Sequence, residues 1–356
     1  MTIAETKQHN AAGTALIPAP PQTVIAFPHT GDYRKDALLE SLDFRWNNLL
    51  PIGSPVTVTF SFAEAAPSYA SVADRFGFQP FTADERALAR DILATIASFT
   101  NLTFTEVSDS ETGYGQIRFG QNQQSGSLAY AYLPNSTNSQ RDGDVYVDVE
   151  TITSQSDPNE DIALLAHEIG HALGLKHPGN YDGAETQSPT AIGNFLGVDE
   201  DSMAYTTMSY RPAPQGQPSL GGIYDILTLR YLYGHRQVET GDNIYSLRDA
   251  QGKVLDTIID DGGIDTLDLG AISIASFVDL REGKFSSIGL AAPGVTAYQN
   301  IAIAFGTQIE KAIGSGFDDT LTGNALANHL AGGGGRDQLI GLAGSDTLDG
   351  GSNEDL

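Results

Sequence analysis

A nine-residue repeat in the C-terminal part of the chain restricts the fold more than any other feature. Written as GGxGxDxUx, with U a large aliphatic residue, its units begin at Gly314, Gly323, Gly332, Gly341 and Gly350. The eighth place of successive units is filled by Leu321, Leu330, Leu339 and Leu348. The pattern is typical of a parallel β-roll, in which glycines permit tight turns and the leucines stack inward as a thin core. A flexible glycine-rich linker is the alternative, but it does not explain a leucine at every ninth residue.

The same repeat predicts several structural calcium ions, because turn carbonyls and aspartates present hard oxygen ligands between successive coils. Candidate ligands in the repeats are Gly314, Asp319, Gly332, Gly333, Gly334, Asp337, Gly341, Ala343, Asp346, Gly350 and Asp355. An earlier segment rich in glycine and aspartate adds Asp260, Gly262, Gly263 and Asp265. The unit at Gly323 has Asn324, Leu326 and Asn328 where glycine and aspartate belong, so we expect it to bind calcium weakly.

The segment 166–177 carries three of the seven histidines. The apolar run before it contains no helix breaker, so a helix can enter the segment and place His167 and His171 one turn apart on one face. Gly174 follows where a helix can end in a left-handed turn, and the redirected chain brings His177 round as a third ligand. Three neutral nitrogens and a water molecule suit one zinc ion.

Glu168 adjoins the first of these histidines and can reach a water molecule on the metal. It would take a proton from that water, deliver the resulting hydroxide to a carbonyl carbon, and return the proton to the leaving amine. The alternative is that HExxH arises by chance in an amphipathic helix with surface histidines. The extended form, with a helix-ending glycine and a third histidine at fixed spacing, is far more specific and favours the zinc site.

With Pro178 directly after the third histidine, the chain resembles the serralysin family of metzincin metalloendopeptidases. That family has a zincin catalytic domain followed by a calcium-binding repeat domain, and a methionine turn that residues 206–211 match. The resemblance implies that Met208 forms a hydrophobic floor beneath the metal. It also implies that the Tyr210 hydroxyl contacts zinc in the resting site and hydrogen-bonds the oxyanion during turnover, where a phenol donor would stabilise negative charge.

Alternating and helical patterns before the zinc segment predict an α+β zincin domain with a mixed twisted sheet and two long helices, followed by the all-β roll. Strands are predicted at 56–62, 102–107, 116–119, 129–133 and 144–147, and a capping box at Thr82 opens the first long helix. The resemblance implies that the edge strand Ala129, Tyr130, Ala131 and Tyr132 pairs with an extended substrate. Such main-chain pairing predicts broad specificity. A plain sheet strand is the alternative.

Composition limits the possible partners and helps to divide the chain. Forty-five acidic against 19 basic residues give a formal charge of −26, which argues against binding nucleic acid or an anionic membrane. There is no cysteine, which excludes disulfides and thiolate ligands, and no apolar stretch long enough to span a bilayer. We expect a flexible arm or propeptide at 1–31, a zinc metalloprotease domain at 32–235 and a calcium-binding repeat domain at 236–356. A monomer is the default.

The combined prediction is a zinc-dependent endopeptidase acting on protein or peptide substrates. The resemblance implies type I secretion to the exterior through a C-terminal signal. The repeat array stops inside its fifth unit at Leu356, so we expect a truncated form of a longer protein. One alternative is a calcium-dependent surface or S-layer-associated binding protein with a vestigial protease domain, against which the intact Glu168 argues. Another is a zymogen held shut by the N-terminal arm.

Overall fold

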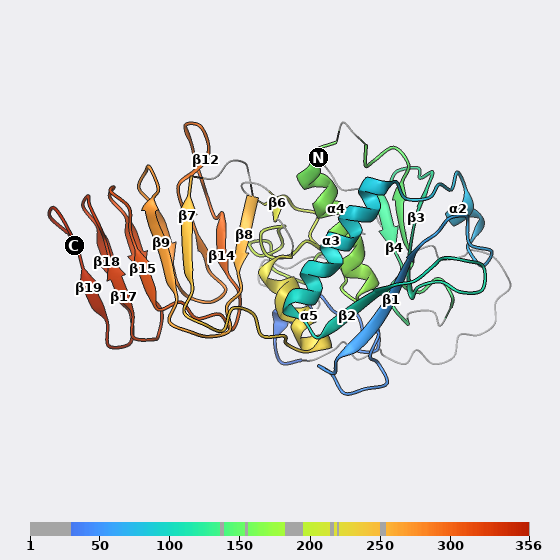
Figure 1. The fold of residues 1–356 in the computed structure, drawn as a ribbon, viewed down its shortest axis with the longest axis horizontal. Helices are drawn as coiled ribbons and strands as arrows, with labels where there is room; N and C mark the ends of the chain where they lie inside the picture. Colours follow the sequence, from blue (N-terminus) through green and yellow to red (C-terminus); the bar gives the residue numbers. More distant parts are fainter. Residues whose placement is uncertain are drawn as a thin grey trace.

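The structure is a computed structural model of the 356-residue chain. It describes residues 30–135, 139–153, 156–181, 195–213, 217–218, 221–249 and 254–355. The predicted N-terminal arm therefore lies almost entirely outside the described residues. The described part is elongated, with helices and one sheet at one end and many short strands at the other (Figure 1).

The helix-containing end is built on a five-stranded sheet with the order β2-β1-β3-β5-β4. Neighbouring strands are parallel, except that β4 runs antiparallel to β5 and forms an edge of the sheet. All five strands coincide with predicted segments: β1 (Val56–Phe62), β2 (Leu102–Glu106), β3 (Ile117–Asn122), β4 (Ala129–Ala131) and β5 (Val145–Asp148). The mixed sheet expected from the sequence is therefore present.

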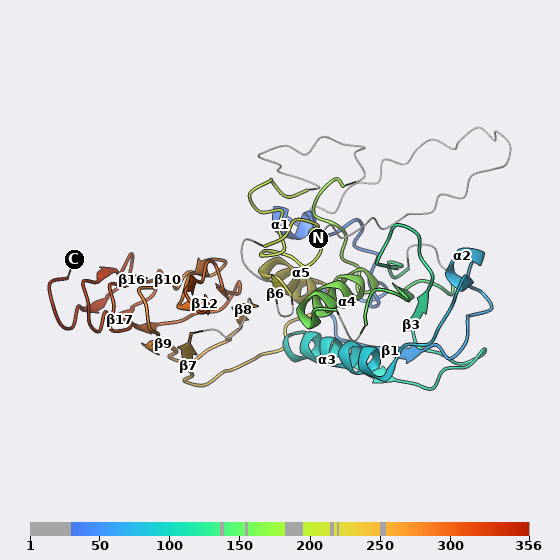
Figure 2. The same cartoon turned by 90° about the horizontal axis from the view of Figure 1, so that it is seen from above.

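Two long helices, α3 (Ala83–Phe99) and α4 (Pro158–Ala172), lie side by side against this sheet (Figure 2). Thr82 and Glu85 form the predicted capping box at the start of α3. Asp157 caps α4, and Pro158 occupies its first turn, where a missing N–H costs nothing. Three further helices are α1 (Tyr33–Asp36), α2 (Val72–Arg75) and α5 (Ile223–Tyr233). One apolar core joins the sheet to α3, α4 and α5 and includes Phe119, Leu165 and Ile169.

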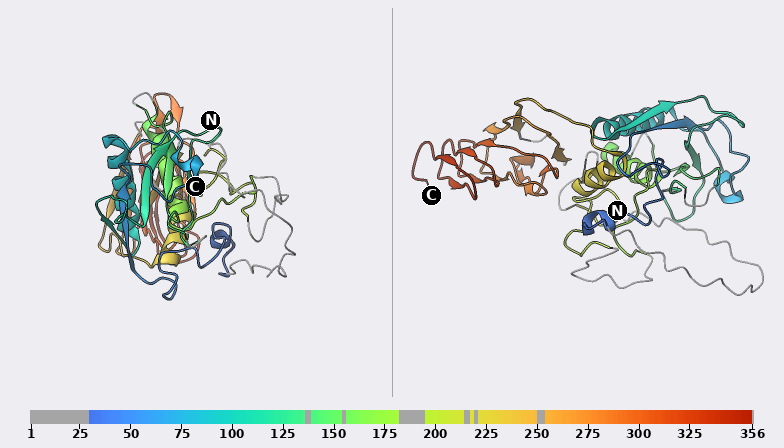
Figure 3. Two further views of the ribbon diagram at one scale, coloured as in Figure 1. Left: turned by 90° about the vertical axis from the view of Figure 1, so that its right-hand side faces the viewer. Right: turned by 90° about the horizontal axis from the view of Figure 1, so that it is seen from below.

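The other end consists of short strands in several sheets (Figure 3). They are β6 (Gln217–Pro218), β7 (Ile244–Arg248), β8 (Val254–Ile258), β9 (Thr266–Ala271), β10 (Phe277–Asp279), β11 (Phe285–Ser286), β12 (Leu290–Ala292), β13 (Val295–Thr296), β14 (Ile301–Ile303), β15 (Lys311–Ile313), β16 (Thr320–Thr322), β17 (His329–Ala331), β18 (Gln338–Ile340) and β19 (Thr347–Asp349). Most neighbouring strands are parallel. The exceptions are β11 with β14 and the β12–β13 hairpin.

Residues 314–355, termed the repeat region, pair with a fixed offset of 18 residues. Leu330 of β17 lies beside Leu348 of β19, and Leu321 of β16 lies beside Leu339 of β18. Two nine-residue units thus make one coil, and alternate units feed alternate sheets. The prediction that all four leucines are buried is wrong for Leu348, which is 49% exposed, whereas Leu321 and Leu330 are fully buried. Strand β19 ends its sheet, so only β17 covers that leucine.

The two ends of the molecule make direct contacts. Arg230 of α5 forms an ion pair with Asp261, with Nη2 and Oδ2 at 2.9 Å, and both side chains are largely buried. The ring of Tyr224 stacks on Phe305, and the guanidinium of Arg34 lies 4.0 Å from the centroid of the same phenylalanine ring. Helix α5 and the N-terminal segment therefore anchor the strand-rich end. These contacts do not test the predicted domain boundary at residue 235.

Candidate metal centre

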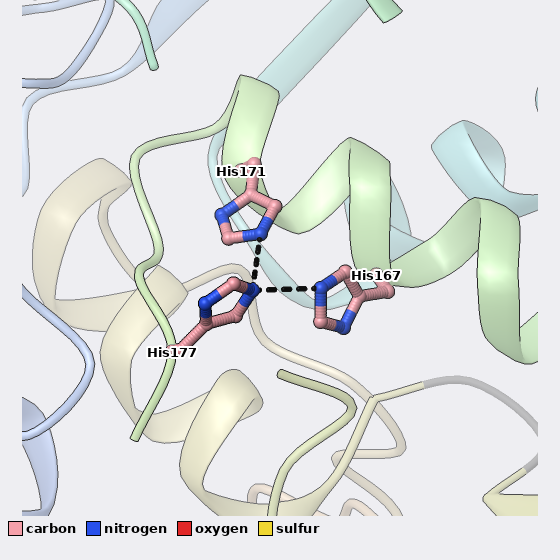
Figure 4. A group of neighbouring side chains, drawn as sticks. All are labelled: His167, His171 and His177. Carbon is pink, nitrogen blue, oxygen red and sulfur yellow. Dashed lines mark hydrogen bonds between the residues drawn. The ribbon is translucent and has the colours of Figure 1, made fainter. Parts of the chain in front are cut away.

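Helix α4 and the turn after it bring three imidazoles together (Figure 4). His167 and His171 come from the helix, four residues apart, and are almost completely buried. His177 comes from the segment that follows and is half-buried. Its Nε2 lies 3.2 Å from Nε2 of His167 and 3.0 Å from Nε2 of His171. We call these three residues the histidine cluster.

Gly174 makes the return of the chain possible. Its φ of +99° is in the left-handed region, which side chains rarely adopt. A Cβ at this position would also lie 2.0 Å from the carbonyl oxygen of Phe44. The turn is closed by the N–H of Leu175, which donates to the carbonyl of Gly170 at 2.9 Å. The chain can therefore carry His177 back to the helix only with glycine here. The next residue, Pro178, accepts a hydrogen bond from Leu196 N–H at 2.8 Å.

The hydrogen bonds of the two helical histidines fix their tautomers. Nδ1 of His167 donates to the carbonyl of Thr207 at 2.7 Å, and Nδ1 of His171 donates to the carbonyl of Leu175 at 2.8 Å. Each Nε2 is therefore unprotonated and turns a lone pair toward the centre of the cluster. Burial lowers the pKa of His167 to about 4 and that of His171 to about 3, so both stay neutral at physiological pH.

This geometry fits zinc. Tetrahedral Zn²⁺ with nitrogen ligands at about 2.0–2.1 Å requires nitrogen atoms roughly 3.3–3.4 Å apart, close to the distances in the cluster. Lone pairs packed against one another without a cation would repel. Within the described ranges, the histidine cluster is the only group of three or more His, Asp or Glu residues whose ligand atoms converge. The three predicted ligands are brought together by the fold.

Glu168 lies on α4 beside His167 and is 2% exposed. Its Oε2 is buried and accepts no hydrogen bond from the described residues. Burial alone raises the pKa of the Glu168 carboxyl to about 8. A buried carboxyl oxygen without a donor is costly unless a ligand or substrate completes its interactions. Glu168 therefore carries a buried carboxyl oxygen that is left for an interaction with a ligand or substrate.

The predicted methionine turn packs directly under the helix. Met208 is fully buried, and its Sδ would lie 2.6 Å from a Cβ placed on Gly170. Gly170 is thus the residue that lets the turn approach α4, between the two helical histidines. Sequence reasoning did not single out this glycine, because the close approach depends on a segment 38 residues further along the chain.

A second residue absent from the sequence predictions is Asp225 of α5. Its buried carboxylate accepts hydrogen bonds from the Thr207 N–H at 2.7 Å, the Thr207 hydroxyl at 2.9 Å and the Gly222 N–H at 2.8 Å. Thr207 in turn supplies the carbonyl that receives the Nδ1–H of His167. Asp225 therefore fixes the loop that orients a metal ligand.

The predicted tyrosine Tyr210 stands over the histidine cluster. Its ring centroid lies 5.7 Å from that of His167 and 4.6 Å from that of His177. Tyr181 stacks on its other face at 4.3 Å, with the planes inclined by 14°. The Tyr181 hydroxyl accepts from the Tyr210 N–H at 3.1 Å and donates to Asp201. Tyr181 and Asp201, which the sequence did not indicate, hold the position of Tyr210.

Strand β4 forms one edge of the sheet and contacts α4. The side chains of Tyr130 and Tyr132 donate hydrogen bonds to Asp74 at 2.8 and 3.0 Å. Tyr132 follows the last residue of β4 but still pairs with Asp144, to whose carbonyl its N–H donates at 3.0 Å. Because backbone groups alternate along an antiparallel strand, those of Ala129 and Ala131 point away from β5, toward the free edge.

The sixth-place residues of the repeat region form a ladder of hydrogen bonds. The N–H groups of Asp319, Asn328 and Asp337 donate at 2.8–3.1 Å to Oδ1 of the residue 18 positions later, which is Asp337, Asp346 and Asp355 respectively. Oδ2 of Asp337 is buried and accepts no hydrogen bond from described residues, and the same holds for Oδ2 of Asp265. These orphaned oxygens fit a cation. Because no set of three carboxylates converges in the described residues, backbone carbonyls would have to complete its coordination.

The remaining calcium candidates lie in connections between strands: Asp260, Gly262, Gly263, Gly314, Gly332, Gly333, Gly334, Gly341, Ala343 and Gly350. Gly333 shows why glycine is needed there. Its φ is +98°, and a Cβ would lie 2.3 Å from the carbonyl oxygen of Ser315 in the neighbouring coil. The turns are therefore close enough for carbonyls of successive coils to face one another.

In the unit at Gly323, side-chain amides rather than aspartates lie next to the backbone carbonyls of the neighbouring segment. The Asn324 amide donates to the carbonyl of Ile309 at 2.8 Å, and the Asn328 amide donates to the carbonyl of Glu310 at 3.2 Å and to the Asn324 side-chain oxygen at 3.2 Å. Neutral amide groups thus occupy carbonyls of the neighbouring segment. This agrees in direction with the expected weak calcium binding of the unit, which stays a prediction.

Comparison with known proteins gives two family matches. The "Matrixin" model matches residues 78–184, which contain the histidine cluster, and the "Peptidase M10 serralysin C terminal" model matches residues 224–354. Met208 and Tyr210 lie between the two matches.

The chain is similar to three curated proteins over most of its length. Serralysin of Photorhabdus sp. (strain Az29) is 32% identical over 306 residues, which cover 78% of this chain and 61% of that protein. Serralysin of Proteus mirabilis is 32% identical over 329 residues, 81% of this chain and 63% of that protein. Metalloprotease AprA of Pseudomonas entomophila is 30% identical over 313 residues, which cover 80% of this chain and 62% of that protein. The chain thus spans less than two thirds of the length of the relatives it matches.

Proposed function

The chain is a serralysin-like metzincin, and we propose that it is a zinc-dependent endopeptidase that hydrolyses peptide bonds of extended protein substrates. The observation that carries the proposal is the histidine cluster with its convergent Nε2 atoms next to the buried, unpartnered Oε2 of Glu168. His167, His171 and His177 would hold the ion. When bound, zinc would act as a Lewis acid toward a substrate carbonyl and lower the pKa of a coordinated water.

Glu168 is the proposed general base and acid. Its free Oε2 accepts a proton from the attacking water as the new C–O bond forms at the scissile carbonyl carbon. It then returns that proton to the amine nitrogen as the C–N bond breaks. Burial raises the pKa of the Glu168 carboxyl, and a zinc ion bound beside it would lower that pKa again. Together these opposing effects support a carboxyl that can both accept and donate a proton near neutral pH.

Tyr210 is the proposed stabiliser of the oxyanion. Its ring lies against two of the imidazoles that would hold the metal, which supports a role for its hydroxyl at the reacting centre. A phenol O–H donating to the developing negative charge would be stronger in the transition state than in the ground state.

Strand β4 is the proposed binding edge for the substrate main chain. The backbone groups of Ala129 and Ala131 would pair with an extended peptide running antiparallel to the strand. The small side chains of these two residues would let the peptide come close. Main-chain pairing of this kind does not depend on side-chain identity, so selectivity would have to come from pockets beside the strand.

The strand-rich end is proposed to bind several calcium ions and to fold with them. Closely spaced carboxylates repel in a calcium-poor compartment, and calcium that binds only the folded form stabilises it by mass action. The orphaned oxygens of Asp265 and Asp337 support this. We further propose export by type I secretion machinery to the exterior, and a monomeric state. No helix in the described ranges is long and apolar enough to cross a bilayer.

The test is hydrolysis of casein by the calcium- and zinc-loaded chain, with Glu168→Ala as the variant. We expect a rate loss of about 10²–10⁴-fold, the usual contribution of a general base, while zinc content and the melting temperature stay unchanged. Asp91→Asn, which removes an exposed charge on α3, is the control and should be fully active. Equal cleavage by Glu168→Ala and wild type would sink the proposed mechanism.

Two other outcomes separate the alternatives. If the chain is a calcium-dependent surface-binding protein, neither wild type nor any variant should hydrolyse casein. The buried Glu168 gives that alternative no support. A zymogen would become active only after limited proteolysis removes residues before about position 30, which N-terminal sequencing of the activated chain would reveal.

A further inference from the structure

A cavity of about 590 Å³ lies beside helix α4, immediately N-terminal to the histidine cluster. This volume is in the range of pockets that bind small molecules or side chains. Tyr210 and Pro212 form one wall. The other residues that line it come from the end of β5, the segment before α4 and the first half of α4, together with Leu128 and Met203. We call it the acidic pocket, because its charged lining consists of Asp148, Glu150, Asp157, Glu160 and Asp161.

The helix connects this pocket to the proposed general base. Asp157, Asp161, Leu164 and Glu168 follow at spacings of four, three and four residues, so they lie along one face of α4. At a rise of 1.5 Å per residue, Asp161 lies about 10 Å along the axis from Glu168. A substrate residue next to the scissile bond can therefore extend its side chain along Leu164 toward Asp161. Asp157 lies about 16 Å along the axis, beyond the reach of that side chain.

The inner surface of the pocket is apolar and its outer part is charged. Leu128, Leu164 and Met203 line it, and Leu164 and Met203 are buried. Among the residues that the structure describes, no lysine or arginine lines the pocket. Within the described ranges, none of the five carboxylates makes an ion pair: Asp148 accepts a hydrogen bond from the Gln124 N–H at 2.6 Å, and Asp161 accepts one from the Ser156 hydroxyl at 2.6 Å. Negative charge in the pocket is thus not compensated by any residue that the structure describes.

The arrangement of the carboxylates favours an organic cation over a metal ion. A metal needs several oxygens converging on one point, and among the described residues only the histidine cluster offers three convergent groups. Carboxylates spread around an apolar channel instead match a long side chain. Lysine and arginine bury an aliphatic stem against apolar surface and keep the charged head in a polar environment.

The strand geometry assigns the side of the scissile bond. Leu128, which lines the pocket, immediately precedes Ala129, the first residue of β4. A peptide antiparallel to β4 reaches the start of that strand with the part of its chain that follows the scissile bond. The pocket therefore faces the new amino-terminal side of the cut.

We propose that the acidic pocket selects lysine or arginine as the residue directly after the scissile bond. The inference rests on the proposed endopeptidase function and deepens it: main-chain pairing with β4 tolerates many sequences, and this pocket supplies the preference. Asp161 is the specificity-determining residue, because it is the pocket carboxylate nearest to Glu168 on the shared helix face.

The experiment uses the zinc- and calcium-loaded full chain and a series of alanine hexapeptides that differ at one central residue: Lys, Arg, norleucine, Gln or Glu. Mass spectrometry identifies the bond that is cut. We expect kcat/KM for the basic peptides to exceed that for norleucine by about tenfold or more, the lower end of the contribution of a hydrogen bond to a charged group. The Glu peptide should be the poorest substrate.

The variant is Asp161→Asn, because the amide oxygen of asparagine can still accept the hydrogen bond from the Ser156 hydroxyl. We expect it to lose the preference for basic residues while cleaving the norleucine peptide as fast as wild type. Asp91→Asn is the matched control for loss of one negative charge. Asp148 is left intact, because its hydrogen bond to Gln124 makes it part of the fold.

A binding series provides a readout that does not need turnover. In the Glu168→Ala chain, fluorescein-labelled Lys and norleucine peptides should differ in Kd by a similar factor, and the difference should shrink at high salt. An equal rate for all peptides, or a preference for norleucine, in wild type overturns the inference while the endopeptidase function stands. A basic preference that survives Asp161→Asn also overturns it. If no peptide is cleaved at all, the proposed function fails, and the binding series alone decides whether the pocket accepts basic side chains.

Discussion

The histidine cluster and the repeat region are two proposed metal-binding parts of one chain, and they are built in opposite ways. The cluster sits on a long helix in the main apolar core, where Leu165 and Ile169 are fully buried. The repeat region rests on one leucine per unit, of which Leu321 and Leu330 are fully buried. Its carboxylates stand beside one another, with oxygens such as Oδ2 of Asp337 left without a donor.

This difference indicates two roles for metal. In the first region, packing and hydrogen bonds place the three ligands, so the metal adds chemistry to an existing structure. In the second, the apolar core is too thin to hold the coils alone, so binding energy of the ion becomes folding energy. The four predictions that follow probe this contrast.

Removal of calcium gives the largest expected effect. Each ion that binds only the folded state at 100 times its Kd contributes about 2.7 kcal/mol, so a calcium-selective chelator should unfold the repeat region. Hydrogen exchange should rise at β15 to β19 and stay low at β1 and β3, with the thermal transition of the helical end retained. Equal protection of both regions in excess chelator would remove the proposed contrast.

In the metal-free chain, acid should lower the stability of the helical end and raise that of the repeat region. The pKa of His167 is lowered by burial from 6.5 to about 4, so between these pH values the unfolded state binds more protons. The helical end therefore loses about 1.4 kcal/mol per pH unit for each such histidine as pH falls through this window. Glu168, with its pKa raised from 4.5 to about 8, opposes this trend but is one group against three histidines.

In the repeat region, we expect acid to increase stability rather than to decrease it. Burial, with the charges of Asp319 and Asp355 nearby, raises the pKa of Asp337 above its ordinary 3.8. Its folded form holds the proton more tightly than the unfolded chain, so stability is greatest below pH 3.8 and is lost as pH rises through the raised pKa. Hydrogen exchange of the two regions between pH 3.5 and 7 checks both signs, and parallel trends would contradict the pKa assignments.

Asp225→Asn tests whether hydrogen bonding from a distant helix prepares the cluster. The amide nitrogen would face the N–H and hydroxyl donors of Thr207, so the loop that holds His167 should loosen. Loss of such outer support typically lowers metal affinity about 10- to 100-fold. Competition with a chromophoric zinc chelator measures this, with Asp91→Asn as control. An unchanged zinc affinity in a folded variant would show that Asp225 supports only the fold.

Matched glycine-to-alanine substitutions give the smallest expected effect. In α4, Gly170→Ala would gain about 1 kcal/mol of helix propensity but would drive Cβ to 2.6 Å from the Met208 sulfur. Overpacking costs about 1–3 kcal/mol, so the net change should be a small destabilisation with weaker zinc binding. Gly316→Ala, with no atom within 4 Å of the added Cβ, is the control and should change stability by no more than about 0.5 kcal/mol.

The features that could be predicted from the sequence are those that depend on residues close together in the chain. The histidines lie within eleven residues, the helix and its glycine turn follow from adjacent residues, and the leucine period of nine appears as parallel strands 18 residues apart. The five strands of the first sheet were predictable for the same reason, because alternation is visible within each strand.

The features that escaped prediction depend on residues that meet only in the folded chain. Asp225 reaches Thr207 from another helix, Gly170 is required because Met208 packs against it, and Tyr181 supports Tyr210 through stacking. The acidic pocket combines Asp148 with the first turns of α4. The inward packing of all four leucines was predicted wrongly, because periodicity does not reveal which coil ends the sheet.

The most direct test of the central claim is a zinc titration of the chain in calcium-free buffer, where the repeat region is unfolded. The account predicts one zinc ion per chain with the same Kd as in calcium, and no zinc bound by His171→Gln or His177→Gln. Zinc binding that disappears with calcium, or that survives these substitutions, would contradict a preformed site made by the three imidazoles.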